Sequence, residues 1–242
     1  MSELVSVVTG GSKGIGLEIV KKLLEQGHQV AACSRSVSEQ LEQLLSSHSD
    51  QISWYKLDLE EEGSVKETAK LISKSYDQID VLINCAAVAQ GSSFLMTRIE
   101  ELRSVFNVNF FNTMLFTQIV AKKMIRKKQG AIVNIASTAG LLSDPGTLAY
   151  GGSKASLIHA TKVLATELGA YGIRVNAVAP AIVNTEMAAL NDQKSIERAE
   201  QRSALSAVIE PEDVAEAVLF LATMSKSSKI TGQVIRVDKG IH

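Results

Sequence analysis

The stretch Thr9-Gly10-Gly11-Ser12-Lys13-Gly14-Ile15-Gly16 lies between an apolar run, 4–9, and a segment of helical periodicity, 15–26. Its first glycine allows a backbone angle that other residues avoid, and the two later ones let the backbone approach a pyrophosphate closely. The start of the following helix offers free N–H groups to such an anion. No Gly-Lys-Ser/Thr ends the stretch, which excludes a P-loop. The stretch predicts a strand, a phosphate-binding turn and a helix, although an ordinary glycine-rich turn has the same composition.

Short apolar runs alternate with longer helical segments along the rest of the chain. Several runs are continuously apolar, such as Val81-Leu82-Ile83, which is typical of strands buried on both faces of a parallel sheet. The expected strands are 4–9, 28–34, 52–58, 79–83, 130–136, 172–178 and 233–237. The expected helices are 15–26, 37–47, 61–76, 98–127, 148–170 and 210–224. This alternation predicts one α/β domain over residues 1–242, a Rossmann-type doubly wound parallel sheet of about seven strands with helices on both faces.

Composition excludes several classes of protein. Of the 242 residues, 45% are hydrophobic, which excludes a disordered chain, and 25 Lys+Arg against 26 Asp+Glu do not form the basic footprint of a nucleic-acid-binding protein. The two cysteines, Cys33 and Cys85, cannot form a disulfide framework, so we expect a cytoplasmic protein. The first residues lack a signal-peptide pattern, and the uncharged stretch 104–121 contains seven polar residues, so we expect no membrane span.

The end of the second expected strand distinguishes two nucleotide cofactors. It contains Ala31-Ala32-Cys33-Ser34-Arg35-Ser36, with no acidic residue to hold a ribose 2′-hydroxyl group. Arg35 and Lys13 can instead bracket a 2′-phosphate through charge-assisted hydrogen bonds, with Ser12 and Ser34 as further donors. This pattern predicts NADP(H) rather than NAD(H); the alternative is a pair of solvated surface charges. The sequence has no zinc-ligand spacing and its four histidines do not cluster, so we expect no metal ion.

A second group of polar residues has the spacing of a reaction centre. Tyr150 and Lys154 are four residues apart and therefore share one face of the expected helix 148–170. Ser137 follows a strand at the edge where open α/β sheets bind ligands. Asn109 interrupts an otherwise apolar helix, where a polar side chain needs a buried partner. We expect these residues to form the catalytic site, although a Tyr–Lys pair by itself is more often a surface contact.

Several short motifs occur in one register along the chain. They are Thr9-Gly10 through Gly16, Asp58-Leu59, Asn84-Cys85-Ala86, Asn109, Ser137, Tyr150-x-x-x-Lys154 and Pro180. Their order and spacing resemble the classical short-chain dehydrogenases/reductases over essentially the whole chain. The segments Gly172-Ile173-Arg174-Val175-Asn176 and Asn184-Thr185-Glu186-Met187 make it most similar to the 3-oxoacyl-(acyl-carrier-protein) reductase branch of that family. The resemblance implies an NADPH-dependent enzyme that reduces a carbonyl to an alcohol by hydride transfer.

The resemblance also implies a role for each matching residue. Tyr150 would be the general acid, with its pKa lowered by the Lys154 ammonium, which would also hold the nicotinamide ribose. Ser137 would donate to the substrate oxygen, and Asn109 would bend its helix and anchor a water. The remaining cofactor contacts would come from Ile15 in the glycine-rich turn, Asp58 and Leu59 at the adenine, Asn84 and Ala86 at its ribose, and Pro180, Ile182 and Thr185 at the carboxamide. Strand-end capping by Asp58 and core packing of Ile182 are the structural alternatives.

The substrate and the partners are less strongly indicated. The resemblance favours a 3-oxoacyl thioester as the substrate. The alternative is a reductase or dehydrogenase of a sugar, polyol or small ketone. A non-catalytic cofactor-binding scaffold is a remote alternative. Arg126-Lys127-Lys128 fits a docking patch for an acyl carrier protein or a solvated helix end, whereas Tyr171 stands where a second basic residue would be expected. The polar segment at about 184–209 is either a mobile lid over the substrate or a plain surface helix.

Four positions depart from the family pattern. Cys85 and Ala87 replace an Asn and a Gly, Ala181 replaces the Gly after Pro180, and Lys239 replaces a Gly near the end. Alanine in place of glycine is harmless only where φ is negative, so Ala87 and Ala181 are expected to narrow the substrate pocket or tilt the nicotinamide.

The expected helix at 104–125 is apolar nearly all round. In a single sheet-and-helix domain one of its faces would remain in water, so we expect a second subunit to cover it. The family resemblance likewise implies a homodimer or homotetramer.

Overall fold

Seven parallel strands form one sheet in the order β3-β2-β1-β4-β5-β6-β7. The computed structural model describes residues 4–188, 193–206 and 208–241. The strands are β1 (Val5–Thr9), β2 (Gln29–Ser34), β3 (Ile52–Lys56), β4 (Val81–Asn84), β5 (Gly130–Ile135), β6 (Ile173–Pro180) and β7 (Val234–Val237). The predicted doubly wound α/β fold is confirmed, and each expected strand is present within a few residues of its expected bounds.

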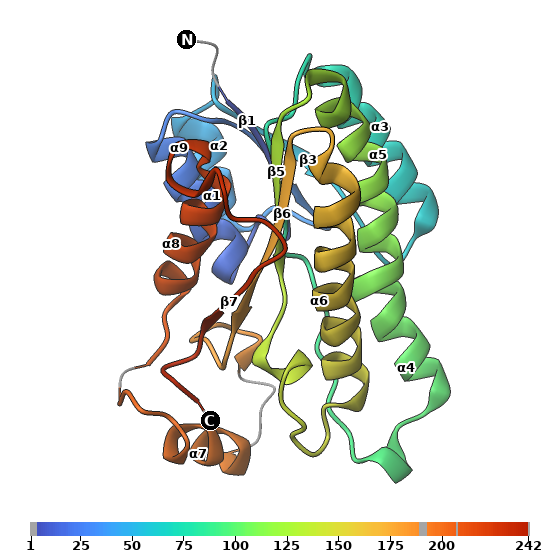
Figure 1. Cartoon of the computed structure of the whole chain (residues 1–242), viewed down its shortest axis with the longest axis vertical. Coiled ribbons are helices and arrows are strands. Elements are labelled where there is room, and N and C mark those ends of the chain that lie inside the picture. Colours follow the sequence, from blue (N-terminus) through green and yellow to red (C-terminus); the bar gives the residue numbers. More distant parts are fainter. Residues whose placement is uncertain (1–3, 189–192, 207, 242) are drawn as a thin grey trace.

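Helices cover both faces of the sheet (Figure 1). One face packs against α1 (Gly14–Glu25), α2 (Glu39–Ser47), α8 (Pro211–Ala222) and α9 (Met224–Ser227). The other face packs against α3 (Glu62–Ser75), α5 (Thr113–Lys127) and α6 (Leu148–Gly169). Two apolar cores therefore lie on opposite sides of strands that are buried on both faces, which explains their continuous apolar runs.

The strand order reverses beside β1. This strand pairs with β2 on one side and with β4 on the other, so the connections after β1 and β4 run to opposite sides of the sheet. A crevice forms outside the carboxyl ends of the strands at such a point. Here the two strand ends are joined through Thr9, whose Oγ1 accepts hydrogen bonds from the backbone N–H groups of Cys85 (3.0 Å) and Ala86 (3.2 Å).

The expected helix 98–127 is present and contains one π-helical turn. It consists of α4 (Ile99–Phe106), a π-helical turn at Asn107–Asn112 and α5. The Asn112 amide of the turn donates outward to the carbonyl of Leu59 (2.8 Å). The hydroxyl of Thr113, the first residue of α5, donates back into the turn to the carbonyl of Val108 (2.9 Å). The helix is therefore confirmed, and the tertiary bond of Asn112 accompanies a wider turn within it, a feature common near functional sites.

The segment at about 184–209 contains a helix that the sequence prediction left open, α7 (Gln193–Gln201). It lies at the same end of the molecule as the chain's C-terminus (Figure 1). Backbone N–H groups of Ala204 and Leu205 donate to the carbonyl of Lys239, so the segment after β7 holds the end of this region. Residues 189–192 and 207 of the predicted lid lie outside the described residues. Among the described helices, none is long and apolar enough to cross a membrane.

Candidate active site

A cavity of about 1230 Å³ lies along the carboxyl ends of the strands. It brings together most of the predicted site residues. Those that line it are Gly10, Ser12, Lys13, Gly14, Ile15, Gly16, Ser34, Arg35, Asp58, Leu59, Ala86, Ser137, Tyr150, Lys154, Pro180, Ile182 and Thr185. Two predicted residues, Asn84 and Asn109, do not line it.

The glycine-rich turn forms one end of this cavity. Gly10 has φ +72°, and a Cβ at this position would lie 2.9 Å from the backbone of Ala86. A Cβ at Gly16 would lie 2.1 Å from the carbonyl oxygen of Gly10, so only glycine allows this close packing of helix α1 on the turn. The start of α1 has no side-chain cap and no acidic residue in its first turn. Its free N–H groups and positive dipole end therefore fit a phosphate group.

Ser137 and Tyr150 meet at the other end of the cavity. Ser137 follows β5, and its Oγ accepts a hydrogen bond from the N–H of Ala139 (3.1 Å), the first turn of a short 3-10 helix. Burial raises the pKa of Tyr150 to about 12, although the neighbouring Ser137 hydroxyl acts in the opposite direction and favours the phenolate. At neutral pH Tyr150 therefore carries a proton that it can donate.

Two glycines hold these residues together. A Cβ at Gly151 would lie 2.5 Å from the carbonyl oxygen of Ala139, and one at Gly140 would lie 2.7 Å from the backbone N of Ala155. Both glycines allow α6 to pack directly on the 3-10 helix Thr138–Gly140, which brings Tyr150 to Ser137. The sequence prediction missed them, although glycine within a helix is a signal because it lowers helix stability.

Lys154 lies one helical turn after Tyr150 and is only 2% exposed. Its Nζ lies 5.6 Å from the centroid of the Tyr150 ring and donates a hydrogen bond to the carbonyl of Ile135 (2.7 Å). Burial lowers the pKa of Lys154 to about 8. Burial disfavours the charged form of both groups, so in this site it opposes the phenolate that Lys154 favours. The expected lowering of the Tyr150 pKa by Lys154 together with a nicotinamide ring stays a prediction.

Asn109 positions the site from outside the cavity. Its side-chain amide accepts a hydrogen bond from the N–H of Val88 (2.9 Å) and donates to the carbonyl of Val88 (2.9 Å) and to Ser153 Oγ (3.1 Å). The hydroxyl of Ser153 in turn donates to the carbonyl of Tyr150 (2.7 Å). Asn109 therefore ties the loop after β4 to the helix that carries Tyr150, which makes it a positioning residue. Its expected role in anchoring a water stays a prediction.

Asn84 is also a structural residue. Its amide donates to Thr117 Oγ1 (2.8 Å) and to Asn134 Oδ1 (2.8 Å), and the Asn134 amide donates to Thr161 Oγ1 (2.9 Å). This buried network joins the two central strands β4 and β5 to helices α5 and α6. Because its side chain points into the core, Asn84 does not line the cavity, and the expected position of this residue beside the adenine ribose stays a prediction.

The two predicted phosphate-binding cations are ion-paired. Lys13 Nζ lies 2.9 Å from a carboxylate oxygen of Glu186, and an Arg35 guanidinium nitrogen lies 3.5 Å from Glu60. Ser34 is not a free donor as expected: its hydroxyl donates to the carbonyl of Ser36 (2.8 Å) and accepts from the Trp54 indole N–H (2.9 Å).

Other predicted cofactor residues are placed as follows. Asp58 lines the cavity, but its carboxylate accepts a hydrogen bond from the N–H of Glu60 (2.9 Å), so the strand-end cap that we gave as the alternative is present. Ile182 is half-buried at the cavity wall and lies outside the core. Among the described residues, only Lys128 and Lys239 have positive φ without being glycine, so Ala87 and Ala181 replace glycine without backbone strain.

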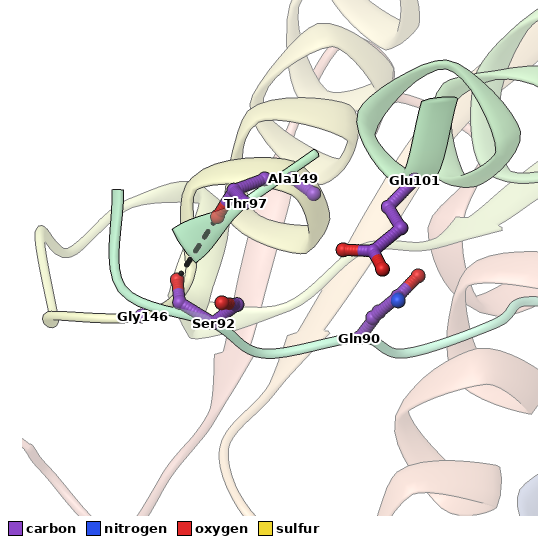
Figure 2. Close-up of a pocket in the computed structure, with 6 residues that line it drawn as sticks. All are labelled: Gln90, Ser92, Thr97, Glu101, Gly146 and Ala149. Carbon is purple, nitrogen blue, oxygen red and sulfur yellow. Dashed lines mark hydrogen bonds between the residues drawn. The ribbon is translucent and has the colours of Figure 1, made fainter. Parts of the chain in front are cut away.

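The substrate end of the cavity contains residues that the sequence prediction missed. Apolar side chains are prominent there: Val88, Leu142, Pro145, Met187 and Ile241. An ion pair between Arg202 and Asp144 (2.9 Å) joins the segment after α7 to the loop after β5. Gln90 lines both this cavity and a small adjacent pocket, where its side chain faces that of Glu101 (Figure 2). No periodicity marks these loop residues in the sequence, because irregular segments bring them together.

Known proteins resemble this chain along nearly its whole length. The family model described as enoyl-(acyl carrier protein) reductase matches residues 10–242. The 3-oxoacyl-(acyl-carrier-protein) reductase FabG of Thermotoga maritima is 35% identical, and the match covers 98% of this chain and 97% of that protein. The 3alpha-hydroxysteroid dehydrogenase of Mediterraneibacter gnavus is also 35% identical, with 97% and 95% covered.

The fold comparison agrees with the sequence comparison. The solved structure of ElxO with NADP bound superimposes with a TM-score of 0.87 at 31% identity, covering 99% of this chain and 98% of that one. Full-length matches at this level of identity, together with the joined Ser137, Tyr150 and Lys154, lead to one conclusion: the chain belongs to the short-chain dehydrogenase/reductase family of oxidoreductases.

Proposed function

We propose that this oxidoreductase uses NADPH to reduce the carbonyl of a 3-oxoacyl thioester to an alcohol. The observation that carries the proposal is the contact of Tyr150 with Ser137 and Lys154 inside a cavity that begins at the glycine-rich turn. FabG of Thermotoga maritima is named as a 3-oxoacyl-(acyl-carrier-protein) reductase, which supports the choice of substrate.

The catalytic residues act on the carbonyl oxygen of the substrate. The Ser137 hydroxyl donates a hydrogen bond to this oxygen as negative charge develops on it. Tyr150 donates its phenolic proton to the same oxygen, and the Lys154 ammonium beside the ring stabilises the phenolate that remains. NADPH supplies the hydride when it is bound. Burial keeps Tyr150 protonated before the reaction, so the acid is ready when the substrate arrives.

The chain's residues fit NADP(H) from one end of the cavity to the other. The free N–H groups at the start of α1 would hold the pyrophosphate, while Lys13 and Arg35 would hold the 2′-phosphate. Lys154 would hold the nicotinamide ribose, and Pro180, Ile182 and Thr185 would frame the carboxamide. The similar structure of ElxO, which has NADP bound, supports this assignment.

The substrate end favours an apolar substrate over a sugar or polyol. Leu142, Met187 and Ile241 contribute apolar side chains there, and Asp144 and Arg202 neutralise each other. A steroid ketone is a second candidate, since a 3alpha-hydroxysteroid dehydrogenase is among the relatives. Exposed Arg126, Lys127 and Lys128 at the end of α5 are the proposed contact for an acyl carrier protein.

The chain acts as one cofactor-binding domain in the cytoplasm, with the segment at about 184–209 as the lid. A homodimer or homotetramer forms by covering α5 and α6. Exposed apolar side chains on these helices, Phe111 beside α5 and Leu148 and Val163 on α6, support this arrangement. Light scattering at micromolar concentration tests it, and a monomeric mass would contradict it.

A panel of substrates tests the proposed function. NADPH oxidation is followed by absorbance with acetoacetyl-CoA, a simple ketone, a keto sugar and a 3-ketosteroid, and each is repeated with NADH. We expect turnover of acetoacetyl-CoA with a preference for NADPH. Activity on the keto sugar alone would reject the acyl substrate, and activity on the steroid alone would favour the second candidate.

A further inference from the structure

Both cations at the adenine end of the cavity are paired with a carboxylate from another part of the chain. Lys13 precedes α1, whereas its partner Glu186 follows β6, at a separation of 2.9 Å. Arg35 follows β2, whereas its partner Glu60 follows β3, at 3.5 Å. All four side chains are more than half exposed, so the pairs are accessible to solvent and exchange partners easily.

These pairs cancel the charge that a 2′-phosphate would otherwise meet. The other cations that line the cavity are Lys154 at the reaction end and Arg202, which pairs with Asp144. Lys13 and Arg35 are therefore the lining cations available at the adenine end of the described cavity, and each already has an anionic partner. A bound phosphate must take the place of Glu186 at Lys13 and of Glu60 at Arg35, or share these cations with them.

NADH lacks the 2′-phosphate, so its binding does not require either cation to leave or share its carboxylate partner. The carboxylates therefore affect the two cofactors unequally, because the cost of breaking or sharing an ion pair falls on NADPH alone. Glu39 and Asp58 also line this end, but the Asp58 carboxylate accepts the N–H of Glu60 and Glu39 lies in the first turn of α2. Neither forms an ion pair with Lys13 or Arg35 among the contacts of the described residues.

We propose that Glu60 and Glu186 set the cofactor specificity of this enzyme by competing with the 2′-phosphate for Arg35 and Lys13. This inference rests on the proposed assignment of those two cations to NADP(H). Glu60 and Glu186 act through their partners Arg35 and Lys13, so they are positioning residues. They limit the preference for NADPH and leave the affinity for NADH unchanged.

The dissociation constants of NADPH and NADH, measured by fluorescence titration, test the proposal. Glu186→Gln and Glu60→Gln should each lower the dissociation constant of NADPH about 1.5- to 5-fold, the range of exposed ion pairs, and leave that of NADH unchanged. Glu61→Gln is the matched control, because Glu61 is an exposed neighbour with no side-chain hydrogen bond at its helix start, and it should change neither constant. An unchanged NADPH constant in both variants would overturn the proposal.

A double-mutant cycle separates this mechanism from a general change in charge. In a Lys13→Ala background, Glu186→Gln should no longer tighten NADPH binding, and raising the ionic strength should reduce the effect of Glu186→Gln in the wild type. An equal gain with and without Lys13 would contradict competition for that cation. If Glu60 instead bonded a ribose hydroxyl, Glu60→Gln would weaken NADH binding, which also contradicts the proposal.

The same measurements distinguish this inference from the proposed cofactor preference. If Lys13→Ala and Arg35→Ala leave NADPH binding unchanged, the proposed 2′-phosphate site itself is wrong. If those variants weaken NADPH binding while the glutamate variants do not tighten it, the competition alone is wrong.

Discussion

The two ends of the cavity use lysine in opposite ways. Lys154 at the reaction end is 2% exposed, is held by the carbonyl of Ile135, and has a pKa lowered to about 8 by burial. Lys13 at the phosphate end has a side chain that is 60% exposed and is paired with Glu186. Burial shifts the pKa of a charged group and strengthens its interactions with neighbouring groups, whereas exposure lets solvent screen its charge. Substitutions at the reaction end should therefore affect turnover, and those at the phosphate end should affect affinity.

Tyr150→Phe should have the largest effect. It removes the proton donor and keeps the ring, so kcat should fall by about 10²- to 10⁴-fold, the usual contribution of general acid catalysis. The dissociation constant of NADPH should stay within about twofold of the wild type. Steady-state NADPH oxidation and a fluorescence titration measure the two quantities. Tyr171→Phe makes the same change at an exposed position near the end of α6 and should leave both unchanged.

The lowered pKa of Lys154 should appear in the pH dependence. Below pH 8 the ammonium is charged and stabilises the phenolate that forms at Tyr150; above pH 8 this charge is lost while Tyr150, with a pKa near 12, stays protonated. The value of kcat/KM for NADPH, which reports groups of the free enzyme, should fall about tenfold per pH unit above pH 8. A profile that stays flat to pH 9.5 would show that Lys154 is not the titrating group.

Much of this site was predictable because it depends on regular elements. The i, i+4 spacing of Tyr150 and Lys154 places them on one helix face, and a strand end fixes Ser137 beside them. Asn84 and Asn109 carry motif signals equally well, but a motif does not reveal which way a side chain points. Neither residue lines the cavity: the Asn84 amide nitrogen bonds Thr117 in the core, and the Asn109 amide bonds the backbone of Val88.

The ion pairs and the π-helical turn were not predictable for a different reason. Glu186 is 173 residues from Lys13 along the chain, so no local pattern links them. The turn at Asn107–Asn112 depends on contacts such as that of Asn112 with Leu59, which exist only once the sheet has formed. Helical periodicity predicts the helix over 98–127, but it carries no signal for a wider turn that depends on such tertiary contacts.

Removing the exposed cations should have a moderate effect on affinity. Lys13→Ala or Arg35→Ala should raise the dissociation constant of NADPH about tenfold, because each removes one charge-assisted hydrogen bond to phosphate in a solvent-screened position. The constant for NADH should change by less than twofold. Lys66→Ala on α3, whose partner is Glu62, is the matched control for removing an exposed, paired lysine. Equal weakening of NADPH and NADH binding would mean that these cations contact a part of the nucleotide that both cofactors share.

The smallest expected effect concerns stability alone. Lys239 has φ +60°, a left-handed conformation that costs an L-residue about 1 kcal/mol relative to glycine. Lys239→Gly should therefore raise Tm by about 2–4 °C for a domain of this size. Thermal unfolding measures the shift, and Lys229→Gly, at a position without positive φ, should not raise Tm. A fall in Tm for Lys239→Gly would mean that contacts of the lysine side chain outweigh the backbone strain.

The rate of a single turnover at saturating NADPH tests the contrast between the two ends most directly. Saturation removes differences in affinity, so only the chemistry at the reaction end remains. We predict that Lys13→Ala/Arg35→Ala turns over within about twofold of the wild-type rate, while Tyr150→Phe is slower by about 100-fold or more. Similar losses in both variants, or wild-type turnover by Tyr150→Phe, would contradict the account.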